Sequence, residues 1–450
     1  MPKPVKNHWM EEIFFKIKKT NRRACFFIGF ALPSIANRVC TKNEQSKQIS
    51  STLATGPVTS GCLTANAVWE SKVKKRHLTF IAALATLATP FLSGSAGAAT
   101  TFLANSFYDQ EHPLSKYGYV EWANTVKELS HGDLQPQVYT GTVLLAPRAS
   151  LQGIRDNIVQ VASHAAIYTP SDLPVANAVQ ELGFNFDDPL TTILAVTDFS
   201  MHNAEQLAEW KKAGVVYLGA YATPPYILFC RQPVRTLADI KGKRIRAAGS
   251  TVSQWLEQAG AIPVNVPSSE MYTGLDRGSL DCATNAANDL IDRSMWEVAK
   301  YTTLLPTGMY WSGPHWGYNP KFWASLSEEQ RQVLQQATAK SMTRMVVEYL
   351  KSSASALEQA KAKGNEVAEP AADLQQSVTD FRKQSLDGIY ALVEQKYQIK
   401  DSKALIDDFL QTYAKWQKLL EGVDRQNEAA LADLAMQQIY SKLPADYGLK

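Results

Sequence analysis

The sequence has few of the features that mark metal sites and cofactor-binding enzymes. Its seven histidines never stand at metal-ligand spacing, and it has no Cys-x-x-Cys pair, so neither a zinc site nor a redox dithiol is indicated. It also lacks a Gly-x-Gly-x-x-Gly motif, a Walker A loop and a Gly-x-Ser-x-Gly elbow. We therefore expect no cofactor, no metal and no catalytic residues. An exported α/β hydrolase whose nucleophile and base meet only in space remains the alternative.

The main part of the chain also lacks an excess of basic residues. The first 98 residues hold 14 Lys and Arg and four Asp and Glu, which leaves 32 basic and 39 acidic residues of the totals of 46 and 43 for residues 99–450. A surface for nucleic acid would require the opposite balance. We expect no nucleic-acid partner.

The third absence is an apolar run long enough to cross a membrane. The most apolar stretch, 78–92, has about 15 residues and contains Pro90. Lys and Arg precede it and Ala96-Gly97-Ala98 follows it, the pattern of a signal peptide over 73–98, cleaved near Ala98. Because a signal this far from the first Met is unusual, we expect residues 1–72 to be a leader from a start site assigned too early. This export signal predicts a periplasmic protein.

Cysteine is scarce as well. Only Cys230 and Cys282 follow the signal, and two isolated thiols are typical of small buried apolar residues. An oxidising compartment would also allow them to pair. The sequence leaves both alternatives open.

After residue 99, short apolar strands alternate with amphipathic helical stretches, which indicates an α/β fold with largely parallel sheets and two lobes. The last third is helical: Ser327-Glu328-Glu329-Gln330 is a capping box that begins a helix running to about Lys363, with Gly364 as its stop. Further helices are expected over 373–395 and 402–426. A helix as long as the first can strap two lobes together.

Several motifs in a fixed order resemble one family over residues 101 to about 400. "TLADIKGKRIRAAGS", "LEQAGAIPVNVPSSEMYTGLDRGSLDC", "EVAKYTTLL" and "WASLSEEQRQVLQQA" are similar to landmarks of the substrate-binding proteins of tripartite ATP-independent periplasmic (TRAP) transporters, C4-dicarboxylate-binding type. The resemblance implies a two-lobed periplasmic-binding-protein fold with a hinged cleft. It also implies a receptor that closes on an organic acid and delivers it to the permease subunits of an ion-driven transporter.

The resemblance assigns the ligand carboxylate to Arg246, the last residue of the Arg-Ile-Arg strand, with help from Asn285. The pattern itself supports Arg246, because ligands of α/β sheets bind beyond the carboxyl ends of strands and arginine matches a carboxylate with two hydrogen bonds. A surface ion pair is the alternative for Arg246, and a turn or helix cap is the alternative for Asn285.

One departure from the pattern of this family concerns the class of ligand. Where some relatives carry a second ligand arginine, this chain has Tyr226, with Arg231 offset, so we expect one carboxylate on the ligand. Aromatic residues that precede a strand, Tyr310 and Trp311, are candidates for the rest of the pocket and suit an aromatic or hydroxylated acid.

In the first lobe, Asn105 and His164 fall where relatives present ligand contacts, although His164 is also compatible with a half-buried structural histidine.

These observations predict a binding protein for a monocarboxylate. We expect the first lobe mostly over 99–225, the second mostly over 226–310, a return strand and strapping helices over 311–400, and a helical extension over 401–450. A sensor subunit that uses the same fold to signal to a membrane partner is a further alternative.

Overall fold

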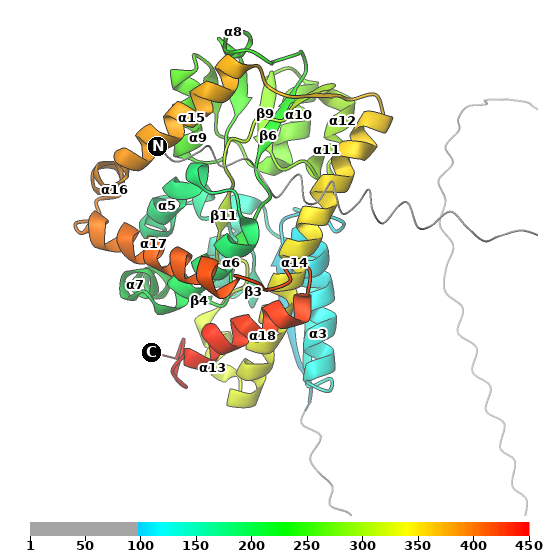
Figure 1. Cartoon of the computed structure of the whole chain (residues 1–450). Coiled ribbons are helices and arrows are strands. Elements are labelled where there is room, and N and C mark those ends of the chain that lie inside the picture. Colours follow the sequence, from blue (N-terminus) through cyan, green and yellow to red (C-terminus); the bar gives the residue numbers. More distant parts are fainter. Residues whose placement is uncertain (1–97, 450) are drawn as a thin grey trace, which may run out of the picture. The chain divides into compact units, whose positions relative to one another are not determined.

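The computed structural model describes residues 98–449. The leader expected over 1–72 and the signal peptide up to residue 97 lie outside the described residues. The described chain forms two lobes, each built on one sheet with helices around it (Figure 1).

Lobe I contains a five-stranded sheet in which β1 pairs in parallel with β2 and β3, while β12 runs antiparallel to β3 and β4. Its strands, in spatial order, are β2 (Leu134–Thr140), β1 (Thr100–Ser106), β3 (Val161–Ala162), β12 (Gly317–Tyr318) and β4 (Val216–Tyr217). A small sheet of β5 (Tyr221–Ala222) and β11 (Trp311–Ser312) follows.

Lobe II contains a six-stranded sheet in which β7 pairs in parallel with β8 and β9, and β6 pairs antiparallel with β9 and β10. Its strands, in spatial order, are β13 (Glu366–Ala368), β10 (Tyr301–Thr303), β6 (Ile227–Cys230), β9 (Cys282–Asn285), β7 (Arg244–Arg246) and β8 (Ile262–Val264). Both sheets are therefore mixed, not largely parallel as expected. Chain segments that return from the other lobe, such as β12, insert in the opposite direction.

The helices of the two lobes are short. Those of lobe I are α2 (Pro113–Ser115), the π-helix η1 (Lys116–Val120), α3 (Glu121–Leu129), α4 (Ser150–Arg155), α5 (Pro174–Gln180), α6 (Pro189–His202), α7 (Ala204–Lys212) and α13 (Pro320–Ser325). Those of lobe II are α8 (Leu237–Ile240), α9 (Ser250–Gln258), α10 (Met271–Asp276), α11 (Asp289–Asp292) and α12 (Met295–Val298). Single 3-10 turns are η2 (Pro147–Ala149), η3 (Ala166–Tyr168), η4 (Glu181–Asn185), η5 (Ser268–Glu270) and η6 (Tyr440–Lys442).

The long helix α14 (Glu328–Ala362) connects the lobes, because it packs against α3 and α6 of lobe I and against α11 and β13 of lobe II (Figure 1). The predicted capping box is confirmed: the Ser327 hydroxyl accepts from the Gln330 amide, and the Gln330 side chain accepts from the Ser327 amide. Gly364 stands just beyond the end of the helix with a φ of +85°, a conformation that favours glycine.

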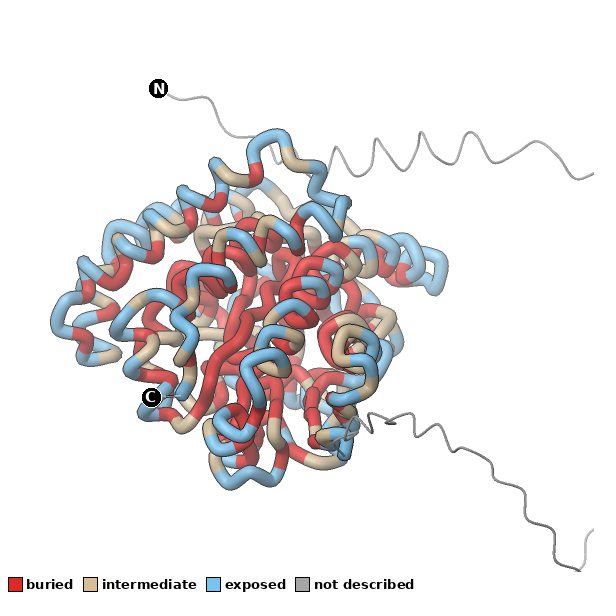
Figure 2. Tube along the Cα trace, turned by 90° about the horizontal axis from the view of Figure 1, so that it is seen from below, coloured by how far each residue is buried: buried red, intermediate tan, exposed pale blue. Residues whose placement is uncertain are grey.

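The segment expected as one helix over 373–395 forms two, α15 (Ala372–Asp387) and α16 (Ile389–Tyr397), separated at Gly388. The extension over 401–450 contributes α17 (Ser402–Leu419) and α18 (Glu428–Gln438). α17 packs against α6, and the Asp198 carboxylate of α6 accepts hydrogen bonds from Lys415 Nζ at 2.6 Å and Trp416 Nε1 at 2.8 Å. The extension thus completes the core of lobe I, and the helices carry buried and exposed residues on different faces (Figure 2).

A disulfide bond joins Cys230 and Cys282. These residues lie directly opposite each other on β6 and β9, and both are buried. Of the two alternatives left open by the sequence, the structure therefore shows the paired one, and separate buried thiols are excluded. The two cysteines pair because strand register places them opposite each other, although they are more than fifty residues apart in the chain.

Candidate functional site

A pocket between the lobes brings together most of the residues predicted for the site. It contains about 350 Å³ of space between atoms, part of it open to solvent. Lobe I, lobe II and the long helix α14 all contribute to its lining. The lining residues are Tyr108, His112, Ile167, Tyr168, Tyr221, Thr223, Tyr226, Arg246, Ala248, Ser268, Asn285, Asp289, Tyr310 and Tyr349.

Arg246 lies at the carboxyl end of β7 and is only 3% exposed. Its guanidinium is held by two backbone oxygens: Nε donates to Val266 O at 3.2 Å, and Nη1 donates to Thr284 O at 3.0 Å. These bonds use only part of its five N–H groups, which leaves donors for an anion in the pocket. Its neighbour Arg244 instead forms an ion pair with Asp281 at 2.8 Å and is partly exposed.

Asn285 lies at the end of β9, the strand next to β7. Arg246 pairs with Ala283, so Asn285, two residues further on, projects from the same face of the sheet. Its Nδ2 donates to the Asp289 carboxylate at 2.5 Å. Strand register therefore brings the two predicted carboxylate-binding residues to the same end of the sheet.

Tyr226 and Tyr310 both line the pocket, as predicted, and four further tyrosines complete its aromatic part. Burial raises the pKa of the Tyr226 and Tyr310 hydroxyls, so both stay protonated and act as hydrogen-bonding groups. Tyr108 donates to the Tyr221 hydroxyl at 3.0 Å, which ties two of the rings together. No local pattern marked these additional tyrosines, because they come from separate segments of the chain.

Three predicted residues do not line the pocket. Trp311 packs in the core of lobe I against Phe186 and Phe409, with ring centroids 5.7 and 5.8 Å away. Asn105 is fully buried at the end of β1, and neither of its side-chain amide atoms has a hydrogen-bond partner among the described residues. His164 is also fully buried, with Nε2 2.8 Å from Thr169 Oγ1, and burial lowers its pKa to about 3. All three lie buried in lobe I, and their role as ligand contacts stays a prediction.

Sequence reasoning missed Asp289 and His112. Asp289 begins α11, one helical turn after Asn285, and its spacing in "NAANDL" was the available signal. Although burial alone would raise the pKa of Asp289, the charge of Arg293 and the contact with His112 hold it below its usual value, so the carboxyl group is ionised. His112 Nε2 of lobe I lies 3.5 Å from Asp289 Oδ1 of lobe II.

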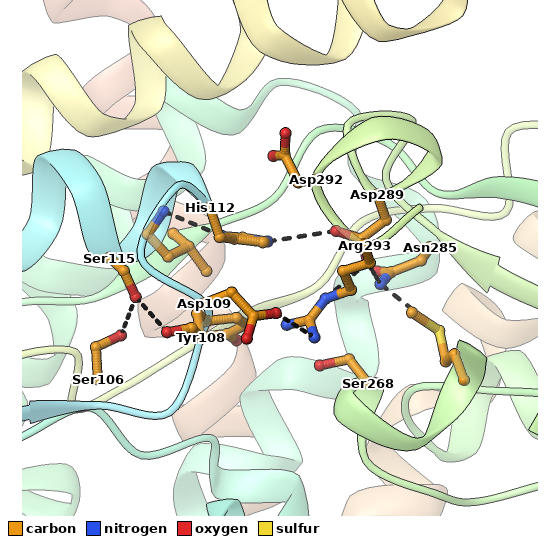
Figure 3. A network of polar contacts seen from close by, with 12 residues as sticks. Ser106, Tyr108, Asp109, His112, Ser115, Ser268, Asn285, Asp289, Asp292 and Arg293 are labelled. Carbon is orange, nitrogen blue, oxygen red and sulfur yellow. Dashed lines mark hydrogen bonds and ion pairs between the residues drawn. The ribbon is translucent and has the colours of Figure 1, made fainter. Parts of the chain in front are cut away.

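An ion pair also crosses between the lobes. Arg293 Nη1 lies 3.1 Å from Asp109 Oδ2, and Arg293 Nε lies 3.3 Å from Asp289 Oδ2 (Figure 3). Arg293 is therefore compensated by two carboxylates and does not itself line the pocket. These contacts place a charged link between the lobes beside the pocket.

Two further properties concern residues 98–449 as a whole. In this range, no three side chains of His, Cys, Asp or Glu are grouped so that they would hold a metal ion. None of the helices described in this range combines the length and the apolar character that a membrane span requires.

Comparison with known proteins agrees with the two-lobed fold. The family model for DctP, bacterial extracellular solute-binding protein, family 7, matches residues 105–391. A solute-binding protein of Albidiferax ferrireducens is 24% identical over 192 residues, which cover 42% of this chain and 55% of that relative. The match thus spans little more than half the length of that relative.

Solved structures match over nearly their whole length. A TRAP solute-binding protein from Rhodoferax ferrireducens, in complex with copurified benzoate, has a TM-score of 0.64 at 18% identity and covers 71% of this chain and 99% of its own. A TRAP periplasmic solute-binding protein from Bordetella bronchiseptica, with bound (R)- and (S)-mandelate, has a TM-score of 0.62 at 20% identity, with the same coverage.

The fold therefore has two α/β lobes joined by a long helix that contacts both, with a pocket between them, and the family model covers most of the described residues. The chain belongs to family 7 of the bacterial extracellular solute-binding proteins, the solute receptors of TRAP transporters, which bind ligands and are not enzymes.

Proposed function

We propose that this receptor binds an organic monocarboxylate, aromatic or hydroxylated, in the pocket between its lobes, with Arg246 as the carboxylate anchor. The observation that carries the proposal is the charge distribution of the lining. Arg246 is the only Lys or Arg among the pocket-lining residues of the described chain, and the lining also has six tyrosines. The Asp289 carboxylate in the lining is paired with Arg293 from outside it, which leaves the charge of Arg246 for the ligand. One cation matches one carboxylate, and aromatic rings match a less polar remainder.

The position of Tyr226 supports a single carboxylate. Tyr226 lines the pocket at the position that corresponds, by the family resemblance, to the second ligand arginine of some relatives. The offset Arg231 is exposed and lies beside a different surface depression. A second carboxylate would then enter a partly buried region without a cation of its own, which is costly. The benzoate and mandelate held by the two solved relatives are both monocarboxylates with an aromatic ring.

The remaining steps follow from the arrangement of the lobes. Because both lobes line the pocket, a bound acid stabilises the closed arrangement over an open one. The closed receptor then delivers the acid to the permease subunits of a TRAP transporter. Export to the periplasm, where the relative from Bordetella bronchiseptica is described, agrees with the predicted signal peptide.

A ligand screen tests the proposal. The purified protein is melted in the presence of benzoate, phenylacetate, mandelate, pyroglutamate, lactate and succinate, and the acids that raise the melting temperature are then measured by calorimetry. We expect a monocarboxylate to give the largest shift and succinate a smaller one. Strongest binding of succinate, or binding of none of these acids, would contradict the proposal.

A further inference from the structure

The orientation of the Asn285 amide determines what the ligand meets beside Arg246. Its Nδ2 donates to Asp289 Oδ2 at 2.5 Å and lies 3.7 Å from the sulfur of Met271 (Figure 3). An ionised carboxylate can only accept hydrogen bonds, so the amide nitrogen, and not the amide oxygen, must face Asp289. The N–H groups of the Asn285 amide thus face Asp289, which also lines the pocket, and the Met271 sulfur, and only the amide oxygen is left without a protein partner among the described residues.

Asp289 is itself held firmly in place. It is buried, Arg293 Nε lies 3.3 Å from its Oδ2, and Asn288 Nδ2 donates to its Oδ1 at 3.1 Å. His112 from lobe I approaches the same Oδ1 at 3.5 Å. With partners on both oxygens, the Asp289 carboxylate has little freedom to turn, and Asn285 is fixed with it.

The group that Asn285 presents to the pocket is therefore its carbonyl oxygen. Asn285 lines the pocket, and its Oδ1 accepts no hydrogen bond from any residue within 98–449. Arg246 lines the same pocket, and its Nη1 donates to the backbone oxygen of Thr284, the residue just before Asn285. The pocket thus combines a cationic donor from Arg246 with a neutral acceptor from Asn285.

We infer that Asp289 is a positioning residue that turns the Asn285 carbonyl toward the ligand, so that the receptor selects acids with a hydroxyl or N–H group on the atom next to the carboxylate. The carboxylate binds Arg246, and the neighbouring donor binds Asn285 Oδ1. This inference rests on the proposed function and names a narrower ligand class within it.

The same geometry disfavours an acid without that donor. A carboxylate oxygen placed against Asn285 Oδ1 would bring two acceptors together, and a C–H group there would leave the amide oxygen desolvated and unpaired. An unpaired buried polar group weakens binding by about tenfold to a hundredfold. Asn285 therefore discriminates between ligands and does not help to hold the carboxylate.

Matched pairs of acids test the inference by calorimetry. Each pair differs in the donor beside the carboxylate: mandelate with phenylacetate, lactate with propionate, and pyroglutamate with cyclopentanecarboxylate. We expect the donor-bearing acid to bind about tenfold to a hundredfold more tightly in any pair that binds. Equal or reversed affinities overturn the inference while the proposed function stands. Absence of binding in all three pairs and in the wider screen overturns both.

Two variants test whether Asp289 positions Asn285 or only stabilises the structure. In Asp289→Asn, the new amide can donate as well as accept, so Asn285 is free to turn, and the preference for the donor-bearing acid should fall severalfold. In Asn285→Ala, the acceptor is lost, and the preference should disappear through weaker binding of the donor-bearing acid. The affinity ratio within a pair is the readout, because a general loss of structure would weaken both acids alike.

Asp281→Asn is the matched control. It makes the same change of side chain in lobe II at a residue that pairs with Arg244 outside the pocket lining, so the affinity ratio should remain that of the wild type. Melting curves check that each variant is folded. A wild-type ratio in both folded Asp289→Asn and folded Asn285→Ala would overturn the inference. If Asp289→Asn does not fold, Asn285→Ala alone decides it.

Discussion

The part of the pocket formed by lobe II carries charges and an amide, whereas the part formed by lobe I consists chiefly of aromatic rings. Arg246 and Asn285 stand at the ends of two strands of the lobe II sheet, and Asp289 begins the short helix α11 that follows. The tyrosines of lobe I come from loops and strands distant in sequence, and Tyr108 and Tyr221 bond to each other. Lobe II thus provides the charged and amide groups of the lining, and lobe I provides most of its aromatic rings.

The lobes also differ in what stabilises them. Lobe II has a disulfide bond across two central strands. Lobe I has the larger aromatic core and contains two fully buried histidines, His164 and His315, whose pKa burial lowers to about 3. Removing a charged side chain of lobe II should therefore weaken ligand binding, whereas a low pH should destabilise the fold of lobe I. The following three predictions test this difference, from the largest expected effect to the smallest.

Arg246→Ala should weaken binding of the best acid from the screen by about 2–5 kcal/mol, roughly 30-fold to several-thousand-fold, because the carboxylate loses its charged partner in a partly desolvated pocket. Calorimetry measures the loss, and circular dichroism checks the fold. Arg244→Ala is the control on the same strand, since its partner Asp281 lies outside the pocket lining. Unchanged affinity in Arg246→Ala, or an equal loss in Arg244→Ala, would contradict the assignment.

Acid should destabilise lobe I through its buried histidines. The pKa of His164 is about 3 in the folded protein, against 6.5 for the free side chain, so the unfolded chain takes up a proton over this range and the folded chain does not. The stabilisation of the folded protein by neutral His164 is fully present above pH 6.5 and is lost as the pH falls toward 3. The loss is about 1.4 kcal/mol of unfolding free energy for each pH unit.

Urea unfolding at several pH values between 6.5 and 4 measures this slope. His164→Gln should reduce the slope by about one proton relative to the wild type, whatever its absolute stability. Val143→Ala, which changes an exposed side chain of the same lobe that binds no proton, should leave the slope unchanged. A wild-type slope in His164→Gln would show that this histidine does not carry the effect.

The smallest effect concerns the link between the lobes. Asp109→Asn should weaken ligand binding about threefold, mainly through faster release, because it removes the Asp109–Arg293 ion pair that favours the closed arrangement. The Asp109 side chain is 58% exposed, so solvent limits the value of the pair. Stopped-flow fluorescence measures release. Glu111→Gln removes an exposed pair with Lys116 inside lobe I and should leave the rate unchanged, and slower release in Asp109→Asn would contradict the role.

Local patterns were enough to predict several parts of the molecule. The capping box at Ser327, the stop at Gly364 and the strand that ends in Arg246 are each contained in a few neighbouring residues, and the structure has all three. The separation at Gly388 and the mixed sheets were not predicted, because they depend on how distant segments pack. Trp311 was predicted from an aromatic run, and Asn105 and His164 were predicted from the family resemblance. All three are buried in lobe I outside the pocket lining, which depends on contacts between distant segments.

By itself, the sequence determined the two-lobed α/β class, the strapping helix and the position of Arg246, since periodicity, caps and strand ends are short-range signals. Tertiary structure decided the pairing of Cys230 with Cys282, the gathering of the tyrosines and the direction of the Asn285 amide. Each of these depends on strand register or on contacts between segments far apart in the chain. Only folding brings those groups within hydrogen-bonding or bonding distance.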